Sequence, residues 1–184
     1  MSPLAAGAGK SFGIEQPASH PERYARAHDF TELAKALWNS WEDDAFDSAD
    51  KDSGVYLNAN AVHPVHYRGP YYQIDSILDM PRPIQGYPVF AQAGNSEVGR
   101  DFAARHAEMI YAAAQFIEDA QAFYKDVKDR VAGYGRDPDT LKVMPGLSYT
   151  IGSSLQEAQD KFGAHEEKVD FGGELNLMGQ DVSA

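Results

Sequence analysis

Apolar residues recur at helical spacing in the first part of this chain. Between Ser19 and Trp41 they return every three to four positions, as on the buried side of an amphipathic helix. Ser19 and Glu22 have capping-box spacing, and Pro21 falls in the first turn, where its missing N–H does no harm. The pattern predicts a helix over about 19–41 whose apolar stripe consists of Ala27, Phe30, Leu33, Ala34, Leu37, Trp38 and Trp41.

Short apolar runs alternate with helical patterns from Pro88 onward. This alternation predicts a parallel sheet with right-handed crossovers. Composition alone leaves an open doubly wound sheet and a (β/α) barrel as alternatives. The predicted strands are 89–93, 108–112 and 141–151, the last of them interrupted by Pro145–Gly146. The predicted helices are 96–106, 116–133 and one that opens at Ser154 with Glu157 in capping-box spacing.

The region between the first helix and this alternation is rich in Asp, Gly, Pro and Asn. It predicts a long loop insertion over 45–87, with a short hairpin around 69–74. A connection of this length in a compact domain is usually functional or mobile. The chain has 184 residues, so we expect a single domain over 1–184, with a Gly-rich tail from Val169.

Composition narrows the classes of partner. The formal net charge is −12, so the surface repels phosphate backbones and we expect no nucleic-acid partner. No apolar run approaches the ~20 residues of a membrane span, and we expect a cytoplasmic protein with no membrane partner. Cysteine is absent. His63 and His66 lie in a Pro-rich loop and are interpreted as solvated, so no metal site is predicted. His106 closes a helix, where a cation is favoured.

His20 and Tyr24 are the first candidate site residues. They are four positions apart in the first turn of the predicted helix, so they share a face beside free amides and the positive dipole end. This arrangement suits a phosphate or another anion. The alternative is that Tyr24 packs as a core aromatic and His20 is an exposed turn residue. The residues alone leave both interpretations open.

Gly94, Asn95 and Ser96 form the second candidate. They follow a predicted strand and open a helix, and the carboxyl ends of parallel strands carry the sites of α/β proteins. The Ser96 hydroxyl and nearby amides suit a phosphate oxygen. The alternative is that Asn95 or Ser96 simply caps the helix, and the two roles are compatible.

Several segments together resemble one family of enzymes. From about Gly9 to Lys161 the chain is similar, in collinear order, to the nitrilotriacetate monooxygenase and dibenzothiophene-sulfone monooxygenase family, a branch of the bacterial-luciferase-like flavin enzymes. The segments that carry the resemblance are His20–Tyr24, Leu37–Ala45, Pro81–Val89, Gln92–Glu97, Ala103–Ala107 and Tyr134–Pro138.

The resemblance implies an α/β fold, namely a partial (β/α)8 TIM barrel that lacks the N-terminal strands. It implies a monooxygenase that uses O₂ and reduced FMN, supplied by a separate NAD(P)H:flavin reductase, to oxygenate a small organic nitrogen or sulfur compound. It also implies that His20, Tyr24 and Ser96 contact the flavin, with Gly94 and Asn95 in the same cofactor-binding segment and His20 as the catalytic residue.

Two other functions remain open from the sequence. One is a deazaflavin-dependent reductase on the same barrel. The other is a non-catalytic, truncated remnant that acts as an interaction module. An incomplete barrel leaves sheet edges open, which favours a homo-oligomer.

Overall fold

A computed structural model describes residue 13 and residues 18–114, 116–147 and 149–166. The chain divides into two compact units, His20–Gly146 and a second unit made of the two chain ends. Each unit is described by itself below. The single domain over 1–184 stays a prediction.

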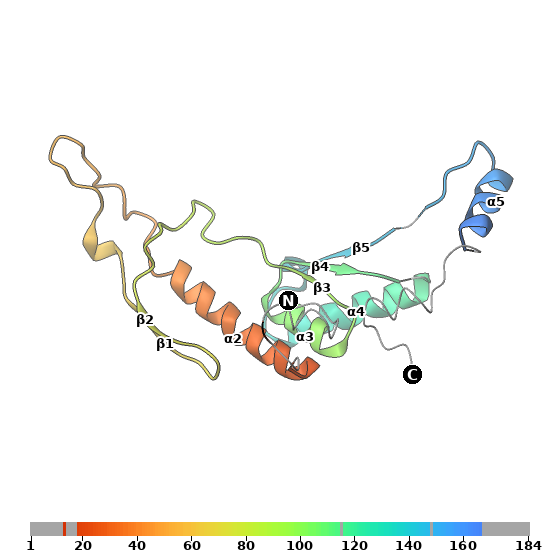
Figure 1. Ribbon diagram of the computed structural model, residues 1–184, viewed down its shortest axis with the longest axis horizontal. Helices are drawn as coiled ribbons and strands as arrows, with labels where there is room; N and C mark the ends of the chain where they lie inside the picture. Colours follow the sequence, from red (N-terminus) through yellow and green to blue (C-terminus); the bar gives the residue numbers. More distant parts are fainter. Residues whose placement is uncertain (1–12, 14–17, 115, 148, 167–184) are drawn as a thin grey trace. The chain divides into compact units, whose positions relative to one another are not determined.

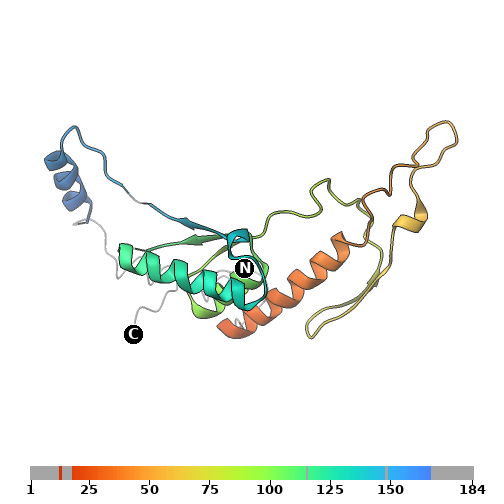
Figure 2. The same ribbon diagram turned by 180° about the vertical axis from the view of Figure 1, so that it is seen from behind.

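A parallel sheet of three strands organises the larger unit (Figure 1). The strands follow one another in chain order, and each crossover contains one helix, which confirms the predicted alternation. Both helices lie on the same side of the strands in Figures 1 and 2. The elements are β3 (Ala91–Ala93), α3 (Glu97–His106), β4 (Met109–Ala112), α4 (Ile117–Gly133) and β5 (Lys142–Pro145).

The last strand of this sheet is shorter than predicted. The sequence favoured a strand over 141–151 with an interruption at Pro145–Gly146, and β5 ends at that interruption, at Pro145. The Gly146 amide still donates to the Ala112 carbonyl at 2.8 Å, but β4 itself ends at Ala112. The strand therefore stops where its ladder partner stops.

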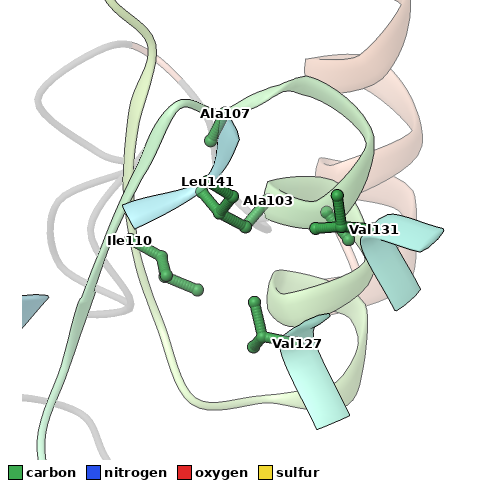
Figure 3. Close-up of a cluster of buried hydrophobic side chains, with 7 residues drawn as sticks. Ala103, Ala107, Ile110, Val127, Val131 and Leu141 are labelled. Carbon is green, nitrogen blue, oxygen red and sulfur yellow. The ribbon is translucent and has the colours of Figure 1, made fainter. Parts of the chain in front are cut away.

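The core lies between the sheet and its helices (Figure 3). Ile110 points from β4 toward α3 and α4 and is fully buried. Burying a side chain of this size contributes about 1.5–3 kcal/mol. Small residues on α3 let that helix approach the strands closely. The buried cluster consists of Ala103, Ala104, Ala107, Ile110, Val127, Val131 and Leu141.

The apolar face predicted for 116–133 is buried only toward its C-terminal end. Val127 and Val131 are fully buried, whereas Phe116 and Tyr124 are 64% and 51% exposed. The reason is length. The 17 residues of α4 extend about 25 Å, whereas β4 and β5, with four residues each, extend about 13 Å. The strands therefore cover only part of the helix.

Helix α2 (His20–Trp38) ends three residues earlier than predicted. Trp41 instead pairs with Val62 in an isolated bridge, and its indole Nε1 donates to the Leu78 carbonyl at 2.8 Å. The predicted apolar stripe is also wrong at one position. Phe30 is 55% exposed, whereas the neighbouring Asp29 is buried.

Asp29 is buried because it anchors a hairpin to α2. Its carboxylate accepts hydrogen bonds from the Tyr67 hydroxyl at 2.6 Å and from the amides of Tyr71 and Tyr72 at 2.8 and 2.9 Å. Burial by itself raises the pKa of Asp29, but these hydrogen bonds outweigh it and hold the pKa below its usual range. A Cβ on Gly69 would lie 1.9 Å from Asp29 Oδ1, so the hairpin turn requires a glycine there.

The hairpin confirms the turn predicted around 69–74. Strands β1 (Val65–Arg68) and β2 (Gln73–Ser76) pair antiparallel, and a short 3₁₀ helix, η1 (Ala59–Ala61), precedes them. A second 3₁₀ helix, η2 (Pro138–Thr140), leads into β5. The wider insertion over 45–87 stays a prediction.

In the other unit, α5 (Leu155–Glu166) begins where its capping residues predicted. The Ser154 hydroxyl accepts from the Glu157 amide at 3.2 Å, and the Ser153 amide donates to the Glu157 carboxylate at 2.7 Å. The tail from Val169 lies outside the described residues. Within those residues, no helix has the length and apolar character needed to cross a membrane.

Candidate functional site

The start of α3 follows the end of β3 after a short turn. Ser96 is the N-cap of α3, and its hydroxyl accepts from the Gly99 amide at 3.2 Å. The capping role that the sequence left open is therefore present. The other amides of the first helical turn have no partner within the helix and form the positive end of its dipole. An anion can bind there without displacing the cap.

Tyr24 reaches this turn from α2. It is 6% exposed, and its hydroxyl accepts from the Gln92 side-chain amide at 3.0 Å. A Cβ on Gly99 would lie 2.9 Å from Tyr24 Oη and 3.0 Å from Ser96 Oγ, so a glycine makes room for both oxygens. A Cβ on Gly94 would lie 3.4 Å from Tyr24 Oη. The structure therefore brings Tyr24, Gly94 and Ser96 together at this turn.

His20 lies one turn before Tyr24 on the same helix. The two ring centroids are 4.9 Å apart in an edge-on arrangement, which confirms that the pair shares a face. His20 is half-buried, and Tyr24 is packed as a buried aromatic that also contacts the Phe102 ring. The core-packing alternative for Tyr24 is therefore observed. Its flavin contact stays a prediction.

Asn95 ties the turn to the neighbouring strand. Its side-chain amide donates to the Ala113 carbonyl at 2.6 Å, just beyond the end of β4. One donor of this exposed side chain is thus engaged by the protein. Asn95 holds the turn at the carboxyl edge of the sheet.

Charged residues beside this turn are largely paired with one another. Arg100 Nη1 lies 3.1 Å from Asp126, and Arg130 lies 3.8 Å from Glu97. A hollow of about 410 Å³ lies next to Asn95 and Arg100, but the carboxylates of Asp119 and Asp126 also line it. These carboxylates disfavour an anion in the hollow. The Ser96 turn is the better phosphate candidate.

Sequence reasoning missed Gln92 and Gly99. Gln92 is the buried residue of β3, and its side chain faces Tyr24. The period-two alternation of a strand could have placed it opposite the exposed residues on either side. Gly99 carried no signal, because its role depends on a phenol that arrives from a segment distant in sequence.

His106 is the clearest correction among the polar residues. The sequence favoured it as a cation at a helix C-terminus, but it is 3% exposed and packs against α2. Burial and the neighbouring Lys35 lower the pKa of His106 to about 3, so the imidazole is neutral. His63 and His66 are exposed, as expected, and each lies beside a carboxylate, Glu42 at 2.6 Å and Asp75 at 2.8 Å.

The fold and the position of this site indicate the general class of protein. Parallel strands, helical crossovers and a helix start at the carboxyl edge of the sheet are the features of an α/β enzyme site. The family model for luciferase-like monooxygenases matches residues 4–180. The chain belongs to this family and carries part of its fold.

Individual relatives agree with this assignment. The chain is 38% identical over 182 residues to nitrilotriacetate monooxygenase component A of Aminobacter aminovorans, covering 94% of this chain and 40% of that protein. It is 40% identical over 152 residues to the dibenzothiophene-sulfone monooxygenase of Rhodococcus erythropolis, covering 83% and 33%. These are the two relatives that the sequence motifs resembled.

Solved structures are similar as well. DmoA from Hyphomicrobium sulfonivorans matches with a TM-score of 0.80 at 33% identity, over 97% of this chain and 38% of that one. A riboflavin lyase, solved with modified FMN and riboflavin, matches with a TM-score of 0.80 at 34% identity, over 87% and 35%. The chain therefore spans about 33–40% of the length of these relatives.

Proposed function

We propose that this chain carries part of the active site of a flavin-dependent monooxygenase. In this proposal, reduced FMN and O₂ oxygenate a small organic nitrogen or sulfur compound. The proposal rests on one observation: the side-chain oxygens of Tyr24 and Ser96 both lie beside Gly99, in the first turn of α3. The names of the relatives support a monooxygenase, and the riboflavin lyase structure, solved with modified FMN, supports a flavin cofactor.

The residues at the turn fit the phosphate end of such a cofactor. The Ser96 hydroxyl and the first amides of α3 would bind the phosphate, because both offer donors at the positive end of a helix. Gly94 and Asn95 would present their backbone to it at close range. Tyr24, held by Gln92, would fix one wall of the site.

His20 is the proposed catalytic residue. It begins α2, and its ring lies edge-on against Tyr24. An imidazole can donate or accept a proton through its ring nitrogens. Bound reduced flavin would supply the reactivity toward O₂. The protein would orient it and exclude water.

A separate NAD(P)H:flavin reductase is the proposed source of reduced FMN. The Aminobacter relative is named as a component A, which supports an enzyme of more than one component. The further partner is the small-molecule substrate. Cytoplasmic location also belongs to this proposal.

Ser96→Ala tests the phosphate assignment. Its matched control is Ser154→Ala, because Ser154 caps α5 through the same hydroxyl–amide contact at 3.2 Å. A hydrogen bond to a charged group contributes about 1.5–3 kcal/mol, so Ser96→Ala should weaken FMN binding by roughly tenfold or more. Ser154→Ala should bind like the wild type.

Flavin fluorescence during FMN titration gives the affinity, and circular dichroism verifies that both variants are folded. Equal affinity of Ser96→Ala and wild type would reject the phosphate site. Titration with a deazaflavin separates the monooxygenase from a deazaflavin-dependent reductase. The modified FMN in the riboflavin lyase structure favours FMN over a deazaflavin.

A second candidate function is a non-catalytic interaction module. An open hollow of about 410 Å³ lies where β4 and β5 meet the exposed half of α4, and its lining is almost entirely apolar. Such a surface suits a polypeptide partner. If the chain is such an interaction module, it should be folded but bind no flavin in the same titration. The lining residues are Ala112, Ala114, Ala120, Gln121, Phe123, Tyr124, Val143 and Pro145.

A further inference from the structure

Three potential metal ligands meet where α2 packs against α3. His28 and Glu32 are four residues apart on one face of α2, and His106 is the last residue of α3. Within the described part of the chain, these residues each offer one ligand atom, and the three atoms lie within 4.8 Å of one another. No ion is present. The fold has therefore assembled two imidazoles and a carboxylate from segments distant in sequence.

The two imidazoles approach each other closely. His28 Nδ1 and His106 Nε2 are 2.6 Å apart, and Glu32 Oε1 lies 3.4 Å from the other ring nitrogen of His106. His106 is held firmly by burial and by the Phe102 ring at 4.9 Å. His28 is half-buried, and the Glu32 side chain is 44% exposed, so both can adjust.

We propose that His28, Glu32 and His106 form a binding site for a divalent transition-metal ion of the Zn²⁺ type. Two neutral imidazoles and one carboxylate are a donor set that suits zinc. Three protein ligands leave a fourth tetrahedral position to water. The ion would join α2 to α3. Its binding does not depend on flavin.

The geometry requires a small adjustment. Two nitrogen ligands of a tetrahedral ion, each at about 2.0–2.1 Å, are separated by roughly 3.3 Å. The histidine nitrogens would therefore move apart by less than about 1 Å from their 2.6 Å contact. The partly exposed His28 can make this movement while buried His106 stays in place. Glu32 would then turn inward to complete the set.

Lys35 already places a positive charge beside this cluster, and that charge repels an incoming metal ion. Its Nζ lies 3.4 Å from His106 Nδ1 and also sits over the Phe90 ring at 5.2 Å. Arg105 and Arg136 add positive charge near His106. Asp29 and Glu32 add negative charge near His28. Removing the Lys35 charge should strengthen metal binding, because repulsion between like charges is relieved.

Calorimetric titration of the tag-free full chain with Zn²⁺, after treatment with a chelator, is the direct test. We expect one ion per chain and a rise in the unfolding midpoint with added Zn²⁺. Residues that only hydrogen-bond to a metal's ligands already contribute about 10–100-fold to metal affinity. His28→Gln and Glu32→Gln should therefore each weaken binding by at least roughly tenfold. Lys35→Gln should tighten it.

His66→Gln is the matched control, because His66 is also a histidine beside a carboxylate, but it is exposed and lies outside the cluster. It should bind Zn²⁺ like the wild type. Co²⁺ gives a second readout: the ligand-field absorption of the wild type should be lost in His28→Gln. Absence of Zn²⁺ binding would overturn the proposal. So would binding that His28→Gln and Glu32→Gln leave unchanged, since the ion would then lie elsewhere on the acidic surface.

Discussion

Single buried polar residues connect distant segments of this chain. Asp29 joins α2 to the β1–β2 hairpin, and Tyr24 joins the same helix to the turn before α3. Both are buried, and both have their polar atoms satisfied, as buried polar groups must be. Each one fixes a helix face that the apolar pattern alone does not specify.

Replacing Asp29 with Asn should reduce the dependence of stability on pH. The native pKa of Asp29 lies below its usual range, whereas the unfolded value is about 3.9. The native state therefore gains stability from the ionised carboxylate above about pH 4, and loses it as the pH falls through the native pKa. The free energy of unfolding, measured by urea denaturation at pH 7 and pH 3, should fall less in Asp29→Asn than in wild type.

The control for this experiment is Asp44→Asn, which changes an exposed carboxylate. It should retain the wild-type difference between the two pH values. If Asp29→Asn also retains that difference, the three hydrogen bonds do not stabilise the ionised form.

Elements in the larger unit are joined at their ends by side chains from neighbouring loops. Arg136, just after α4, donates from Nη1 to the Ala104 carbonyl and from Nη2 to the Ala107 carbonyl, each at 2.8 Å. Ala104 lies in the last turn of α3 and Ala107 is its C-cap, and carbonyls at a helix C-terminus have no partners within the helix. The guanidinium thus fixes α3 against the segment that leads into β5.

Arg136→Met should destabilise the chain by about 1–3 kcal/mol, because two carbonyls lose a charged donor. Arg136→Lys should recover only part of this loss, since a single ammonium cannot reproduce the forked geometry. Urea denaturation at neutral pH measures both. Lys125→Met, which removes an exposed pair with Asp129, serves as the control and should change stability little. Equal effects of Arg136→Met and Lys125→Met would contradict a capping role.

At the scale of the whole molecule, the sheet is covered on one face. Ile110 and Ala112 of β4 face the helices and are buried, whereas Met109 and Tyr111 are 36% and 52% exposed on the opposite face. Met144 of β5, paired with Tyr111, is 49% exposed as well. An exposed apolar face of this kind is typical of a surface that another polypeptide covers.

We expect the isolated chain to form a homo-oligomer through this face. Met144→Lys should lower its mass toward the monomer, because a charge on a buried apolar contact is costly. Light scattering after size exclusion measures the mass. Ile84→Lys, at an exposed apolar residue outside the sheet, should leave it unchanged. A wild-type chain that is monomeric throughout would contradict the expectation.

The order of helices and strands from residue 88 onward was determined by the sequence itself. Periodicity and capping residues are local signals, so the start of α3 at Ser96 and of α5 at Ser154 could be read directly. The motifs also identified the family, which the family model and the relatives confirm. The candidate turn at Gly94–Ser96 was likewise visible, because it depends on neighbouring residues.

Only the tertiary structure decided which polar residues are buried and what they contact. Asp29 is buried because a hairpin some 40 residues later supplies its donors, and Gly99 matters because Tyr24 arrives from another helix. The length of β5 and the exposed half of α4 depend on where β4 ends. The contact between His28 and His106 likewise depends on the packing of α2 against α3. Contacts between distant segments leave no periodic trace in either segment, so the pattern of the chain alone cannot specify them.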